Sequence, residues 1–362
     1  MNIINKYRLA IVFSILIITF SSCKKENTIF NDILPYDGGT LTLSGIASTE
    51  TGINAANSVF VDMSRNTQTS ALRAAWDLGF YCSTTDFKVI INHSTVATIV
   101  QINKTDLSAV TSADIASLPN DSNTLIVGAN AAMTTVDPVA GDFSTYLTGL
   151  VINNVSANDA ENKVYILNRG RGGNIANRAF LKMKINRRTN GYTVSYAPID
   201  QAEPSSFDVQ KDASFNFKYL SFSSASVVVE PAKANWDFEW TLSTTKNAVT
   251  GLPVATPDFV QINFGGGVKA AEVIFGTDLT KNYDSFQDSD IESLTYLGTR
   301  EVIGTNWRNA ATSNASVLNI NNDRFYVIQD PAGNYYKLRF SGGGRGRPEL
   351  VFKLLRAAEI LH

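Results

Sequence analysis

The chain has 362 residues, of which 44% are hydrophobic and 18% are charged, and its formal net charge is −2. This composition is typical of a globular protein and excludes a disordered, collagenous or coiled-coil chain. The small net charge excludes a strongly basic surface that would recruit nucleic acid. Because the chain has only two cysteines and two histidines, a zinc domain rich in these residues is excluded, and any metal site would consist mainly of carboxylates.

The segment 1–22 has the features of a secretory signal peptide. Lys6 and Arg8 precede the apolar run Leu9–Phe20, which is too short to span a bilayer. Small residues then lead to Cys23, as in the lipobox of bacterial lipoproteins. We therefore expect cleavage before Cys23 and attachment of a lipid anchor to its thiol. The alternative is an ordinary secretory signal followed by a chance cysteine.

Residues 23–40 are predicted to form a lipidated tether, because they are polar and contain Pro35 and two adjacent glycines. The two lysines before Glu26 resemble the charged export signals of surface lipoproteins, which favours exposure on the cell surface. If Cys23 carries lipid, Cys82 has no partner in the chain. We therefore predict a fold without disulfides, in which Cys82 is a small apolar core residue.

Five sequence anchors occur twice in the same order, which predicts two related domains. The anchors are Trp76-Asp77 and Trp236-Asp237, Asp86-Phe87 and Asp258-Phe259, Thr105-Asp106-Leu107 and Thr277-Asp278-Leu279, Asp114-Ile115 and Asp290-Ile291, and the strand pairs 163–167 with 182–185 and 324–328 with 337–340. We assign the first domain to residues 41–203 and the second to residues 204–362.

The hydrophobic pattern has a period of two residues over much of the chain. Trp76, Leu78 and Phe80 alternate with less apolar residues, which is typical of a strand with one buried face. Turn signals such as Asn190-Gly191 separate these runs. The segment 111–118 is the single candidate for a short helix. The sequence therefore predicts an all-β fold, with each half an antiparallel sheet or sandwich built from hairpins.

An ordered set of motifs in the second half carries a family resemblance. The set comprises a strand at 218–223, Asn235-Trp236-Asp237 and late strands at 324–328 and 336–340. Together with the lipobox, this order resembles the HmuY-like family of Bacteroidetes lipoproteins, most clearly over residues 210–356 and more loosely in the first half. The resemblance implies an all-β fold, an outer-membrane anchor and capture of haem at the cell surface for a TonB-dependent receptor.

The axial haem ligands that the resemblance implies are not evident in this sequence. Haem-binding members use His or Met on loops between the mid-domain helix and the late strands, but residues 295–323 contain no His, Met or Cys. The matching interval of the first half contains Met133, which is either a ligand or a gap-filling apolar contact. His93 is either an exposed turn residue or a lone haem or metal ligand.

Arginines and one tryptophan provide further candidates for ligand binding. Arg345 and Arg347 lie in a glycine-rich turn, as do Arg169 and Arg171. These arginines are either solvated residues of flexible hairpins or groups that hold an anionic ligand such as a haem propionate. Trp307 would suit stacking on a porphyrin or a sugar if it is exposed, and is otherwise a core residue.

The sequence contains no Gly-x-Ser-x-Gly elbow, Walker loop or His-Glu-x-x-His motif, and we predict that the protein is not an enzyme. We expect an outer-membrane, lipid-anchored binding protein on the cell surface, with haem or a related porphyrin as its ligand and no nucleic-acid partner. One alternative is a surface glycan-binding or adhesion lipoprotein that does not bind haem. A further alternative is an interaction subunit without a small ligand.

Overall fold

A computed structural model of the chain describes residues 34–51, 54–171, 175–276, 279–309 and 318–359. The predicted signal peptide and Cys23 lie outside the described residues. Eighteen strands form four antiparallel sheets, which confirms the predicted all-β class. The residues from Pro35 onward form one compact unit.

The four sheets are named by their strand order. The first, β11-β10-β9-β8-β6, comprises Ser205–Gln210, Gly191–Pro198, Leu181–Arg188, Val164–Asn168 and Thr98–Ile102. The second, β13-β12-β4-β5, comprises Ala225–Val227, Phe217–Ser221, Leu78–Tyr81 and Val89–Ile91. The third, β15-β14-β2-β3, comprises Pro253–Ile262, Phe238–Lys246, Asn57–Asp62 and Thr67–Leu72. The fourth, β1-β19-β18-β17-β16, comprises Gly38–Thr42, Arg347–Arg356, Tyr335–Gly344, Arg324–Gln329 and Lys269–Ile274.

The helices are short and lie in the connections. The α-helices are α1 (Ser112–Ala116) and α2 (Phe143–Gly149), and β7 (Pro119–Ser122) is outside the four sheets. The 3-10 helices are η2 (Arg73–Ala75), η3 (His93–Thr95), η4 (Asn123–Leu125), η5 (Met133–Thr135), η6 (Phe264–Gly266), η7 (Leu279–Lys281) and η8 (Asp288–Ser293). Helix α1 lies inside the predicted segment 111–118, and Thr111 caps it with Asp114 in a capping box.

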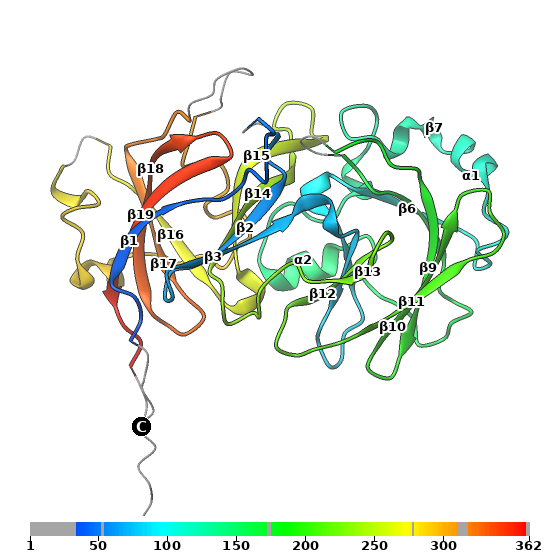
Figure 1. The fold of residues 1–362 in the computed structure, drawn as a ribbon, viewed down its shortest axis with the longest axis horizontal. Coiled ribbons are helices and arrows are strands. Elements are labelled where there is room, and N and C mark those ends of the chain that lie inside the picture. Colours follow the sequence, from blue (N-terminus) through cyan, green and yellow to red (C-terminus); the bar gives the residue numbers. More distant parts are fainter. Residues whose placement is uncertain (1–33, 52–53, 172–174, 277–278, 310–317, 360–362) are drawn as a thin grey trace, which may run out of the picture. The chain divides into compact units, whose positions relative to one another are not determined.

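Two sheets combine strands from both halves of the sequence. Strand β2 of the first half pairs with β14 of the second half, and β12 of the second half pairs with β4 of the first half. Each hairpin therefore pairs with the strand that directly follows the Trp-Asp motif of the other half (Figure 1). Strand β1 pairs with the last strand, β19, so the end of the predicted tether, from Gly38 to Thr40, belongs to a sheet.

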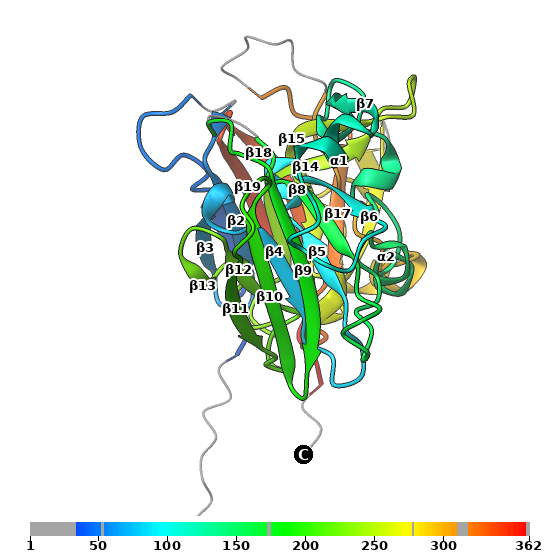
Figure 2. The same ribbon diagram turned by 90° about the vertical axis from the view of Figure 1, so that its right-hand side faces the viewer.

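The predicted boundary between residues 203 and 204 falls between β10 and β11. These two strands are hydrogen-bonded neighbours from Tyr196↔Ser205 to Gly191↔Gln210, and β11 runs along the edge of the β9–β10 hairpin (Figure 2). The end of the first repeat and the beginning of the second therefore share one sheet.

Corresponding residues of the sequence repeat make corresponding hydrogen bonds where the exchanged strands meet. Asp77 N donates to Leu220 O, and in the other half Asp237 N donates to Val61 O. Likewise, Asn92 Nδ2 donates to Trp76 O, and Asn263 Nδ2 donates to Trp236 O. All four donor–acceptor distances are 2.6–2.9 Å. The same local geometry thus occurs twice, each time with the hairpin of the other half.

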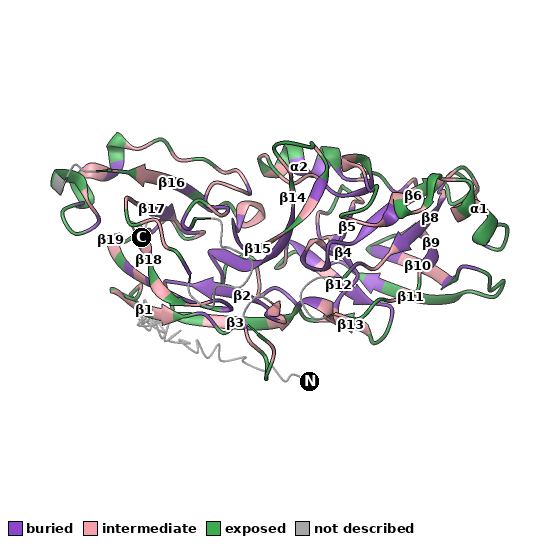
Figure 3. Cartoon of the chain, turned by 90° about the horizontal axis from the view of Figure 1, so that it is seen from above, coloured by how far each residue is buried: buried purple, intermediate pink, exposed green. Residues whose placement is uncertain are grey.

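Three of the hydrophobic clusters define the packing of the sheets. One cluster lies between the first and second sheets, and another lies between the third and fourth sheets, so that buried residues concentrate in the strands (Figure 3). A third cluster joins the halves: Trp76 packs edge-on against Tyr219 with ring centroids 4.9 Å apart, and Trp236 packs against Phe60 at 5.1 Å. Cys82 is a buried free cysteine, as predicted.

Asp77 and Asp237 occupy matching positions but have different partners. Arg169 donates to Asp77 through Nε at 2.8 Å and Nη2 at 2.7 Å, and Arg178 Nη1 donates to it at 3.2 Å. Asp237 accepts a bond of 2.7 Å from Met63 N and forms no ion pair with the described residues. Burial raises the pKa of Asp237 well above its usual range, which disfavours the charged form of this carboxyl.

The substitution Asp77→Asn should destabilise the fold much more than Asp237→Asn. A neutral amide at position 77 would leave two largely buried guanidinium groups without their carboxylate, which costs about 3–5 kcal/mol of unfolding free energy. At position 237 the carboxyl has no cationic partner among the described residues and an amide oxygen can still accept from Met63 N, so we expect a loss of about 1 kcal/mol or less. Urea unfolding at pH 7 of the chain from Lys24 onward measures both values, and equal losses would contradict this account.

Candidate functional site

A cavity of about 430 Å³ lies beside the loop that joins β8 to β9. We call it the arginine pocket, and its lining consists of Val96, Ile126, Val127, Asn168, Gly170, Arg171, Asn177, Arg178, Phe180 and Ala255. The volume is typical of small-molecule sites, which combine an apolar wall with a few polar groups. All but one of these residues lie between positions 96 and 180, and Ala255 comes from β15.

Asn168 and Gly170 fix the shape of the loop. Asn168 Nδ2 donates to Leu125 O at 2.5 Å, and its Oδ1 accepts from Gly170 N at 3.0 Å. Gly170 has φ +71°, and a Cβ atom there would lie 2.2 Å from Thr95 O and 2.7 Å from Ala97 N. A glycine is therefore required where the loop packs directly on η3 and its following turn.

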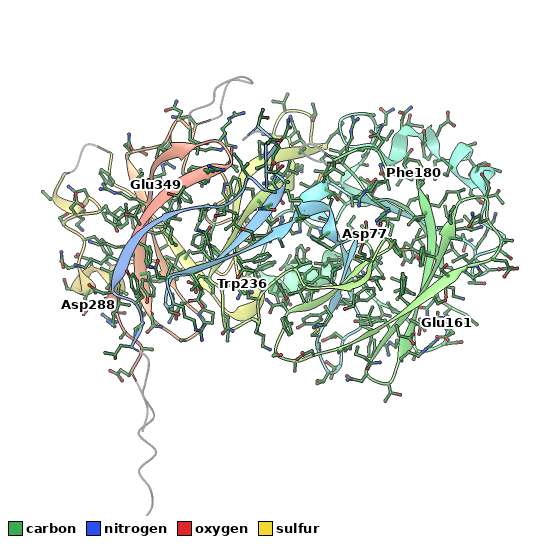
Figure 4. The ribbon with its side chains drawn as sticks, viewed as in Figure 1. Asp77, Glu161, Phe180, Trp236, Asp288 and Glu349 are labelled. Carbon is green, nitrogen blue, oxygen red and sulfur yellow. The ribbon has the colours of Figure 1, made fainter. Side chains whose placement is uncertain are left out.

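The two arginines of the pocket are held differently. Arg178 is bound through Asp77 and the carbonyl oxygen of Arg169, but within the described part of the chain its buried Nε atom has no hydrogen-bond partner. Arg171 is exposed and forms no ion pair with the described residues. Phe180, on the pocket wall, and Asp77 are labelled in Figure 4. The arrangement can hold an apolar body against the wall and a carboxylate against a guanidinium group.

Some arginines of the glycine-rich turns are buried and others are exposed to solvent. Arg169 is 12% exposed and pairs with Asp77, and Arg345 is 8% exposed, so the interpretation as solvated hairpin residues is wrong for both. Arg347, on β19, is exposed. The glycine-rich motif indicated Arg171 but not Arg178, which follows later in the same loop without any local motif.

The pocket does not fit axial ligation of haem iron, because its lining contains no His, Met, Cys or Tyr. His93 lies on η3 and points elsewhere: its Nε2 is 3.5 Å from Glu239 Oε2 and its side chain is 15% exposed. The interpretation as an exposed turn histidine is therefore wrong. Met133, on η5, is half-buried outside the pocket.

Trp307 belongs to the core of the second half. Its ring is 1% exposed and stacks on Phe340 with centroids 4.0 Å apart, and its Nε1 donates to Asp258 O at 3.1 Å. Of the two interpretations of Trp307, the core residue is therefore confirmed, and stacking on a porphyrin or a sugar is excluded because other residues cover the ring. The sequence candidates His93, Met133, Trp307 and Arg345 do not converge on one site.

A second cavity, of about 40 Å³, lies where the halves meet. We call it the junction cavity. Aromatic rings, among them Trp76, Trp236 and Tyr146, form part of its wall, and His93 and Glu239 contribute charged or titratable groups. Since one water needs at least about 10–15 Å³, the cavity has room for about two or three waters. It is far too small for a porphyrin.

Buried polar contacts surround the junction cavity, and the one from Arg300 to Val139 joins the two halves. Arg300 Nε donates to Gln261 Oε1 at 2.7 Å, and its Nη1 donates to Val139 O at 3.2 Å. Glu230 accepts from Phe217 N at 2.8 Å, and burial raises the pKa of Glu230 to about 8. This carboxyl is therefore largely protonated at neutral pH, which limits the negative charge in the cavity.

The substitution Glu230→Gln should flatten the pH dependence of stability. Between the usual carboxyl pKa and about 8, the folded chain keeps a proton that the unfolded chain releases, so stability falls as pH rises, by at most about 1.4 kcal/mol per unit. The wild type should therefore lose more unfolding free energy than Glu230→Gln between about pH 5 and pH 8. Urea unfolding tests this, with Glu203→Gln at an exposed position as the control. Parallel pH profiles for the wild type and Glu230→Gln would refute the assignment.

Comparison with known proteins gives one family. The family model described as HmuY protein matches residues 54–197, which include every residue that lines the arginine pocket except Ala255. The sequence motifs pointed most clearly to residues 210–356, so the match falls on the part for which the resemblance was looser. No curated protein and no solved structure matches the chain. Over residues 54–197, the chain is therefore similar to the HmuY protein family.

Proposed function

We propose that the protein is a lipid-anchored, non-enzymatic binding protein that captures a porphyrin outside the cell, in the arginine pocket and without axial ligation of iron. The composition of the pocket carries this proposal. Val96, Ile126, Val127 and Phe180 provide apolar surface, and Arg171 is an unpaired cation among the described residues. A porphyrin offers a flat apolar ring and carboxylates that match these two kinds of surface.

The family match supports the choice of ligand class. The HmuY family is associated with haem binding in general, and the pocket lies almost entirely within the matched residues. Because axial ligands for iron are missing from the pocket, binding should depend on the porphyrin ring and its carboxylates and not on the iron. Haem and metal-free porphyrin should therefore bind to similar extents.

The proposed location follows from the lipobox at Cys23. No helix among the described residues is long and apolar enough to cross a membrane, and two acyl chains suffice for stable attachment. We propose an outer-membrane protein that faces the cell exterior and passes its ligand to a TonB-dependent receptor.

Glycan binding through exposed tryptophans has no support in the positions of these residues. All four tryptophans of the chain are buried, with exposures of 4% or less for Trp76, Trp236, Trp240 and Trp307. A sugar ring cannot stack on a side chain that other residues cover. We therefore rank glycan binding below porphyrin capture.

Fluorescence and absorbance titrations of haemin and metal-free protoporphyrin test the proposed ligand. We expect the two dissociation constants to agree within about threefold, and Arg171→Gln to weaken both about tenfold through loss of one charged contact. Arg347→Gln, which changes an exposed arginine outside the pocket, is the matched control and should have no effect. Binding of haemin alone, or no binding at tens of micromolar protein, would refute the proposal.

The substitution Cys23→Ala tests the anchor in the producing cell. Without the thiol no lipid can be attached, so we expect loss of labelled fatty acid from the protein and its release from the membrane fraction. Porphyrin binding by the released chain should be unchanged, because the earliest residue of the pocket in the sequence, Val96, is far from Cys23 along the chain. Retention of fatty acid by the variant would show that Cys23 is not the acylated residue.

A further inference from the structure

A third cavity, of about 240 Å³, lies in the second half of the chain against β17 and β18. We call it the Arg339 pocket. Its lining includes Phe275, Tyr283, Arg324, Arg339 and Phe340, and it shares no residue with the arginine pocket. It therefore plays no part in the function proposed above.

Two buried polar atoms in this pocket, Arg339 Nε and the Tyr283 hydroxyl oxygen, have no hydrogen-bond partner among the residues that the structure describes. Tyr283 is only 6% exposed, and the guanidinium carbon of Arg339 lies 4.7 Å from the centre of its ring. Buried polar groups in folded proteins nearly always have a partner. Two such groups side by side in one cavity indicate that a ligand completes their hydrogen bonds.

The charge balance of the pocket favours an anion. Arg324 is neutralised by Glu272 Oε1 and Asp323 Oδ1, each at 2.9 Å. Arg339 forms no ion pair within the described ranges, and Asp284, the acidic residue next to Tyr283, does not reach it. The pocket thus presents one uncompensated positive charge beside a phenol hydroxyl.

We propose that the Arg339 pocket binds a small carboxylic acid with an aromatic or apolar body. Arg339 and the Tyr283 hydroxyl donate to the carboxylate, which satisfies both unpartnered groups. Phe275 lines the same cavity and packs in one hydrophobic cluster with Tyr283, so its ring contacts the apolar part of the ligand. The cavity is little more than half the volume of the arginine pocket, which restricts the ligand to a single small ring or a short chain.

Fluorine NMR with 4-fluorobenzoate tests this site on the chain from Lys24 onward, in which the part from Pro35 forms one compact unit. We expect saturable binding of the acid, and at least about tenfold weaker binding of the uncharged 4-fluorobenzyl alcohol. Arg339→Gln and Tyr283→Phe should each weaken binding of the acid by about fivefold or more. Arg347→Gln and Arg171→Gln are controls that should leave it unchanged.

Several outcomes would overturn the proposal. These are equal affinity for the acid and the alcohol, no binding at about 10 mM probe, or full affinity in a folded Arg339→Gln variant. If the Arg339→Gln variant does not fold, an unchanged affinity of Tyr283→Phe for the acid would overturn the proposal instead. Loss of binding in Arg171→Gln would place the probe in the arginine pocket and refute the Arg339 site, whereas failure of porphyrin to bind leaves the Arg339 site untouched.

Discussion

Backbone hydrogen bonds between strands of different halves are the constraint on which the rest of this structure depends. Strand β2 completes the sheet of β14, and β12 completes the sheet of β4. An unpaired strand edge exposes donors and acceptors that must be satisfied, so neither half can close its second layer alone. The aromatic cluster of Trp76, Tyr219, Phe60 and Trp236 and the cavity beside it exist because these exchanged hairpins meet there.

The sequence predicted the class of structure much better than its connectivity. Alternation of apolar residues around Trp76 identifies a strand and its buried face, and the repeat of Trp76-Asp77 at Trp236-Asp237 identifies two equivalent strands. Neither pattern tells which hairpin pairs with which strand, because both hairpins suit both edges. The exchange is a property of long-range pairing, and local periodicity contains no information about it.

For the individual site residues, too, the local sequence did not predict the long-range contacts. His93, Arg169 and Arg345 were interpreted from their neighbours in the sequence as turn residues, but all three are covered by segments distant in the chain. Trp307 is likewise covered by Phe340. The arginine pocket depends on Arg178 and on the loop at Ile126, which the hydrogen bond from Asn168 to Leu125 holds in place. No motif links these positions, so only the fold brings them together.

The pairing of β1 with β19 also governs the order in which the chain can be completed. Gly38 lies opposite Lys353, so one sheet joins residues that are very far apart in the sequence. Closing so large a loop is slow and entropically costly, and the strand pair cannot form before the last residues are available. If the amino terminus is held at a membrane, β1 stays unpaired until β19 has been synthesised. Strand β1 then becomes the last strand of its sheet to be secured.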